Sequence, residues 1–91
     1  MKRAIRVYIS GTVQGVFFRS FIKENAEKLG VKGFVRNLED SRVEVFIEGN
    51  PEEVKKMVEI CKKGPKHSQI KNVEEKEEKF QGMKTFKVLH I

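Results

Sequence analysis

The first thirty residues change from a period of two to a helical period. In the segment AIRVYISG, residues 4–11, the apolar Ile5, Val7 and Ile9 alternate with polar residues, which is typical of a half-buried β-strand. Between residues 18 and 29 apolar side chains recur every three or four positions, as on one face of an α-helix, and Gly30 follows as a C-terminal cap. The pattern predicts a strand followed by a helix.

Two further strands are predicted next. The segments at residues 31–37 and 42–49 have strand character, and the polar LEDS between them indicates a hairpin. The two strands should therefore pair antiparallel. The apolar positions of the second strand alternate with three residues that are expected on its other face, namely Glu44, Phe46 and Glu48.

A second helix is predicted to begin after Asn50, which stands as an N-cap before Pro51. Glu53 lies three residues beyond Asn50, the spacing of a capping box. Gly64 and Pro65 mark the end of this helix. Its buried stripe is expected to consist of Val54, Met57, Val58 and Cys61.

The remaining segments, residues 68–80 and the closing TFKVLHI, have strand character. The order is βαββαβ, with room for one additional short strand. Two βαβ units predict an α+β sandwich, in which a mainly antiparallel sheet of four to five strands carries both helices on one face. The charged run at residues 74–79 is interpreted as protection of a sheet edge against pairing with another chain.

Length and composition narrow the class of protein. A chain of 91 residues without repeats or linkers is expected to form a single domain over residues 1–91. One cysteine excludes an intrachain disulfide framework, and no leader or membrane-spanning run is evident, so a soluble, cytoplasmic protein is expected. The many Lys and Glu residues resemble thermophile proteins, and we expect thermostability. The net charge of +6 favours anionic partners: nucleic acid, acidic lipid or phosphorylated metabolites.

The turn between the first strand and the first helix is the candidate site. Gly11 and Gly15 allow the segment between them to curl, so that free backbone N–H groups at the helix start converge on an anion. Arg19 adds a rigid guanidinium that suits two phosphate oxygens. The residues alone leave two interpretations open, because Arg19 can also simply solvate a helix end. The spacing of the P-loop and of the dinucleotide fingerprint is absent.

The thiol and imidazole groups do not suggest a metal or a nucleophile. Cys61 falls on the apolar stripe of the second helix and is interpreted as a packed side chain. His67 and His90 are far apart and lack acidic or cysteine neighbours at ligand spacing. We therefore expect no metal and no cofactor.

The motifs VQGVFFR, LGVKGFVRN, RVEVFIEG and the pair Gly64 and Pro65, together with Gly11, closely resemble those of the acylphosphatases. The resemblance runs in the same order over nearly the whole chain. It implies a ferredoxin-like sandwich and a catalytic pair, Arg19 and Asn37. It further implies a phosphate cradle made of the backbone amides of Gln14, Gly15, Val16, Phe17, Phe18 and Arg19.

The chain departs from the family pattern at a few positions. Ser41 stands after Asp40 where glycine is usual, so the type of turn there is an open question. Phe34 replaces a frequent tryptophan, and Lys66 and Ser68 replace a frequent proline and alanine after the second helix. None of these changes touches the implied catalytic pair.

The resemblance implies hydrolysis of small acyl phosphates to a carboxylate and inorganic phosphate. We expect a monomer without nucleic-acid or membrane partners. A carboxylate leaves without a proton donor because its conjugate acid has a pKa of roughly 4.3. Asn37 would position the attacking water, although an asparagine at a strand end also commonly just closes a turn.

Arg36 is expected to point to the opposite face of its strand and to be solvated.

An RNA-binding module of RRM topology is the alternative interpretation. RRM domains share the βαββαβ order and stack bases on sheet aromatics, a role that Tyr8 and Phe46 could fill on the open face. Against it, Glu44 and Glu48 flank Phe46 and would repel a phosphate backbone, and the RNP1 pattern is absent.

Overall fold

The computed structural model describes residues 1–13, 16–66 and 68–89. The elements follow in an order that confirms the predicted sandwich and includes the additional short strand. They are β1 (Arg3–Thr12), α1 (Val16–Leu29), β2 (Lys32–Asn37), β3 (Val43–Gly49), α2 (Pro51–Lys63), β4 (Gln69–Glu78) and β5 (Phe86–Leu89).

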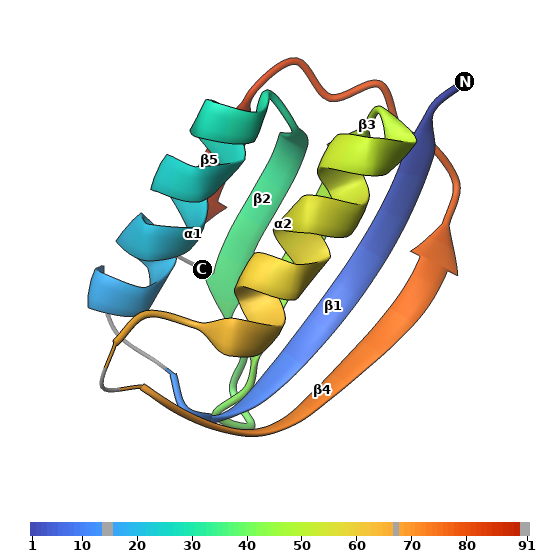
Figure 1. Cartoon of the computed structure of the whole chain (residues 1–91). Helices are drawn as coiled ribbons and strands as arrows, with labels where there is room; N and C mark the ends of the chain where they lie inside the picture. The colour runs from blue at the N-terminus through green and yellow to red at the C-terminus, as the bar shows by residue number, and fades with distance from the viewer. Residues whose placement is uncertain (14–15, 67, 90–91) are drawn as a thin grey trace.

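The strands form one five-stranded sheet in the order β4-β1-β3-β2-β5. Neighbouring strands are antiparallel except for β2 and β5, which run parallel at one edge. Both helices cover the same face of the sheet, as predicted (Figure 1). Because β1 and β2 each pair antiparallel with β3, these two strands run in the same direction and end at the same end of the sheet.

The hydrophobic core lies between the sheet and the two helices. The predicted apolar faces of β1 and β3 are buried there, and so is the whole predicted stripe of α2. The end of α1 has the hydrogen bonds of a Schellman motif, in which the Gly30 amide donates to Glu27 O and the Val31 amide donates to Ala26 O. Gly30 has φ of 74°, which confirms its predicted capping role.

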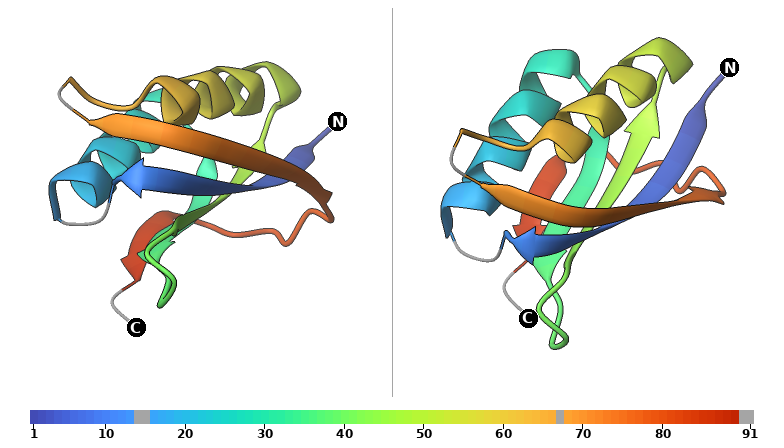
Figure 2. Two further views of the ribbon diagram at one scale, coloured as in Figure 1. Left: turned by 90° about the horizontal axis from the view of Figure 1, so that it is seen from below. Right: turned by 60° about the horizontal axis from the view of Figure 1, so that its bottom comes forward.

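The other face of β3 is not open to solvent, contrary to the simple alternation in the sequence. Glu44, Phe46 and Glu48 are all buried. The segment 79–85 passes across this face (Figure 2), and the amides of Gln81 and Met83 donate to the two carboxylate oxygens of Glu48 at 2.6 and 2.5 Å. A buried carboxylate requires such partners, because an unpaired buried charge is costly.

The predicted start of α2 is confirmed, but the predicted side-chain capping hydrogen bonds are not. Asn50 is the N-cap, with Pro51 following it and its own carbonyl accepting from the Val54 amide at 2.9 Å. The capping-box prediction is wrong, because the Asn50 side chain makes no capping hydrogen bond. Its Oδ1 instead accepts a hydrogen bond from Nζ of Lys2 at 3.1 Å, so a contact distant in sequence has taken the place of the local one.

The charged run at residues 74–79 falls mostly in β4, which is an edge strand. Several of its side chains form ion pairs with neighbouring elements, including Lys62 with Glu75 at 2.7 Å and Arg3 with Glu77 at 2.6 Å. Charged side chains on an edge strand oppose pairing with a second chain. In the described parts of the chain, neither helix is long and apolar enough to span a bilayer.

In the β2–β3 turn, Ser41 has the left-handed backbone conformation that glycine favours. The Ser41 amide donates to Leu38 O at 3.2 Å, the Leu38 amide donates to Arg42 O at 2.8 Å, and Ser41 has φ of 76°. A positive φ is costly for any residue with a Cβ atom, which explains why glycine suits this position.

We expect Ser41→Gly to raise the free energy of unfolding by about 0.5–1 kcal/mol, because the relief of the left-handed strain exceeds the added freedom of the unfolded chain. Urea denaturation followed by circular dichroism measures the change. Ser41→Ala is the matched control, since it also removes the hydroxyl group but keeps the Cβ atom. A glycine variant no more stable than the alanine variant would contradict the assignment of strain.

Candidate active site

Near its end β1 has an irregular backbone that requires glycine. Gly11 has φ of 136°, and a Cβ atom added there would lie 2.0 Å from the carbonyl oxygen of Gln69. The register between β1 and β4 also shifts between Ser10 and Gly11. A side chain at Gly11 would therefore clash with the β4 backbone at the point where the chain leaves β1 for α1. Gln14 and Gly15, two of the predicted cradle residues, lie outside the described residues.

The start of α1 has the properties of an anion-binding site. The first N–H groups of a helix have no acceptor within the helix, and in α1 they belong to Val16, Phe17 and Phe18. The first turn of α1 contains no acidic side chain that would neutralise the positive end of the helix dipole. An anion beside these amides would be stabilised by both effects.

Arg19 follows directly in the same turn of α1 and is half-buried. The Cα atom that carries its side chain therefore lies in the same helical turn as the three amides. A guanidinium is charged at any physiological pH and offers paired donors to phosphate oxygens.

Asn37 is the last residue of β2 and is paired with Val43 of β3. Its side-chain oxygen Oδ1 is shielded from solvent and has no hydrogen-bond partner among the described residues. The end of β2 and the end of β1 lie at the same end of the sheet, and α1 packs against β2. Asn37 and Arg19 are thus near the same end of the molecule although 18 positions separate them in the sequence.

Comparison with known proteins identifies the family to which this chain belongs. The family model described as Acylphosphatase matches residues 5–88 of this chain. An acylphosphatase of Rubrobacter xylanophilus is 50% identical over 80 residues, which cover 88% of this chain and 73% of that protein. The chain belongs to the acylphosphatase family. The ferredoxin-like architecture implied by the motifs is confirmed by solved acylphosphatase structures.

Two of these structures match nearly the whole of this acylphosphatase. The crystal structure of the acylphosphatase from Bacillus subtilis superimposes with a TM-score of 0.91 at 32% identity and covers 99% of this chain and 100% of that one. The acylphosphatase from Coxiella burnetii gives a TM-score of 0.90 at 33% identity, with 97% and 93% covered. The family relation therefore extends over the strand, turn and helix that carry the candidate site.

Arg36, the neighbour of Asn37, belongs to a separate cluster on the face of the sheet opposite the helices. Its Nε donates to the buried carboxylate of Glu44, which also accepts from Nη1 of Arg6 at 2.5 Å. Nε of Arg6 in turn donates to Glu78 at 3.3 Å. The prediction that Arg36 is simply solvated is therefore wrong, because its guanidinium is half-buried and neutralises a carboxylate inside the sheet.

The same face does not offer the base-stacking surface of an RRM domain. Phe46 is only 1% exposed, because it stacks on Phe34 with ring centroids 5.7 Å apart and lies 5.1 Å below the guanidinium of Arg6. The Tyr8 ring is similarly covered by Arg42 at 4.7 Å. The acidic residues beside Phe46 are buried and paired, so the covering of the aromatic rings, rather than repulsion by these carboxylates, prevents base stacking on this face.

Cys61 is packed in the core, as predicted, and burial raises the pKa of its thiol to about 12. A thiol with this pKa carries almost no thiolate at neutral pH and does not act as a nucleophile. His67 and His90, the imidazoles considered in the sequence, lie outside the described residues.

Proposed function

We propose that this acylphosphatase cleaves the carboxyl–phosphate anhydride bond of small acyl phosphates by attack of water on phosphorus, releasing a carboxylate and inorganic phosphate. The phosphoryl group is held by the backbone amides of residues 14–19 and by the Arg19 guanidinium, and Asn37 positions the water. The observation that carries this proposal concerns Oδ1 of Asn37, at the end of the sheet where α1 begins. This oxygen is shielded from solvent and has no hydrogen-bond partner in the part of the chain that the structure describes.

The amides and Arg19 supply the electrostatic part of catalysis. Phosphoryl transfer through a loose transition state spreads negative charge over the phosphoryl oxygens, so catalysis depends mainly on position and charge stabilisation. The amides of Val16, Phe17 and Phe18, which have no acceptor within the helix, donate to those oxygens, and Arg19 can bridge two of them. These donors already belong to a folded helix and a half-buried side chain, so little reorganisation is required.

Asn37 supplies the acceptor for the attacking water. A buried acceptor without a partner costs about 1–3 kcal/mol, so a folded protein that keeps one is expected to use it. The torsion that ends an asparagine side chain is soft, and a small rotation brings Oδ1 onto a water molecule that arrives with the substrate. The water donates one hydrogen bond to Oδ1, and its proton passes to a phosphoryl oxygen of the substrate as the new P–O bond forms.

The departing group needs no proton donor. The bond between phosphorus and the acyl oxygen breaks with its electron pair remaining on a carboxylate, whose conjugate acid has a pKa of roughly 4.3. This explains how a site with one cation and one amide side chain suffices for the reaction.

Turnover of several acyl phosphates by the purified protein tests the proposal. We expect hydrolysis of acetyl phosphate, benzoyl phosphate and carbamoyl phosphate, measured as inorganic phosphate and unchanged by a chelator. Glycerol phosphate is the control, because its alkoxide is far too basic to leave without a proton donor and it should not be hydrolysed. Failure to hydrolyse any acyl phosphate, or equal hydrolysis of glycerol phosphate, would overturn the proposal.

We further propose that residues 1–91 act as a single-domain, cytoplasmic monomer without nucleic-acid or membrane partners. The charged side chains of edge strand β4 support the monomer, and the reduced, buried Cys61 fits the cytoplasm. The covered ring of Phe46 supports the exclusion of nucleic acid.

A further inference from the structure

Phe17 is an exposed aromatic residue beside the proposed phosphate site. It is the second residue of α1, and 86% of its surface is accessible to solvent. An isolated exposed apolar side chain is common on protein surfaces and needs no explanation by itself. Phe17, however, forms one wall of a cavity at the start of α1.

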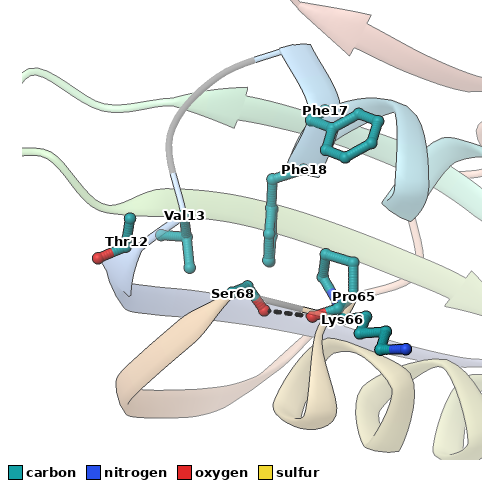
Figure 3. A pocket seen from close by; sticks show the side chains of 7 residues that line it. All are labelled: Thr12, Val13, Phe17, Phe18, Pro65, Lys66 and Ser68. Atoms are coloured by element: carbon teal, nitrogen blue, oxygen red, sulfur yellow. Dashed lines mark hydrogen bonds between the residues drawn. The ribbon is translucent and has the colours of Figure 1, made fainter.

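The cavity, called here the Phe17 cavity, has a volume of about 160 Å³ and lies between the end of β1, the start of α1 and the segment after α2. Figure 3 shows that the Lys66 ammonium points away from the other side chains, and the Ser68 hydroxyl is already engaged with Pro65 O at 2.7 Å. The walls are therefore mainly apolar. The lining residues are Thr12, Val13, Phe17, Phe18, Pro65, Lys66 and Ser68.

The position of the cavity matches the geometry of the reaction. In phosphoryl transfer the attacking and leaving oxygens lie roughly in line on opposite sides of phosphorus. Asn37, which would hold the water, lies at the end of β2. Pro65 and Ser68 precede β4, an edge strand that β1 and β3 separate from β2. Seen from below, the first turn of α1 lies between the segment after α2 and the β2–β3 turn (Figure 2).

We infer that the Phe17 cavity binds the acyl group of the substrate and selects apolar acyl groups of about the size of a benzoyl group. The inference rests on the proposed function, because it assumes a phosphoryl group on the α1 amides. An apolar cavity of about 150 Å³ is large enough to hold benzene, so the volume is adequate for one aromatic ring. An acetyl group would fill only a small part of it and would gain little from the walls.

The test is the ratio of kcat/KM for benzoyl phosphate to kcat/KM for acetyl phosphate. We expect Phe17→Ala to lower this ratio about tenfold, because the lost wall interacts with the larger acyl group alone. Pro65→Ala removes a second wall residue of the cavity, from the segment after α2, and should also lower the ratio. Proline has no backbone N–H group, so this substitution removes no backbone hydrogen-bond donor. A partly unfolded variant loses both activities equally, so the ratio is insensitive to folding yield.

Phe80→Ala is the matched control, because Phe80 is also an exposed phenylalanine, at 50%, but follows β4 at the opposite end of the sheet. Its ratio should stay within about twofold of the wild type, since it contacts neither acyl group. If both Phe17→Ala and Pro65→Ala hydrolyse the two substrates with an unchanged ratio, the acyl site is wrong while the proposed function stands. If the wild type hydrolyses neither substrate, both proposals are overturned.

Discussion

Arg19→Ala is expected to lower kcat for benzoyl phosphate by about 100-fold or more, equivalent to at least about 2.7 kcal/mol of transition-state stabilisation. The guanidinium would be the main cation next to phosphoryl oxygens on which negative charge develops. Because it also contacts the phosphate in the ground state, we expect KM to rise as well. Steady-state release of benzoate, followed by absorbance, measures both parameters.

Two further variants separate the guanidinium from charge in general. Arg19→Lys keeps one positive charge but loses the planar pair of donors, so it should recover only part of the lost rate. Arg3→Ala removes an arginine that is ion-paired with Glu77 on the β4 side of the sheet, and its kcat should equal that of the wild type. A folded Arg19→Ala protein with near-normal turnover would show that Arg19 only solvates the start of α1.

Asn37→Ala is also expected to lower kcat by about 100-fold or more, with a smaller effect on KM, because the water is positioned mainly for the transition state. The same change should leave the free energy of unfolding nearly unchanged. The reason is that Oδ1 has no partner in the described structure, so its removal relieves an unpaired buried acceptor while losing little packing. Kinetics and urea denaturation of the same samples provide both measurements.

The two measurements distinguish catalysis from a structural role. If Asn37 merely closes the β2–β3 turn, Asn37→Ala should lower stability and retain turnover, which is the reverse pattern. Asn37→Asp preserves the size of the side chain but should be no more active than Asn37→Ala, because its carboxylate repels the phosphoryl dianion. An aspartate variant with restored turnover would contradict the assigned role of a neutral acceptor.

Local sequence patterns determined the elements and the position of the candidate site. The stripe of Val54, Met57, Val58 and Cys61 is buried as its helical spacing predicts, and Gly30 caps α1 as its position predicts. These features depend on neighbours within a few residues, so periodicity and capping rules are sufficient. The prediction that Arg19 lies at the start of a helix that follows the first strand has the same local origin.

Tertiary structure decided the features that depend on residues distant in sequence. The alternation in β3 indicated a polar outer face, but segment 79–85 and the arginines of β1 and β2 cover it, so Glu44 and Glu48 are buried with partners. Lys2 likewise donates to Oδ1 of Asn50, the side-chain oxygen that was expected to accept a hydrogen bond from the start of α2. The Phe17 cavity needs Pro65 from beyond α2. The surroundings of Asn37 likewise decide that its Oδ1 has no hydrogen-bond partner among the residues described. Periodicity indicates which face of an element is apolar. Which chain segment covers the other face depends on contacts between elements that are distant in sequence, and a local pattern holds no information about those contacts.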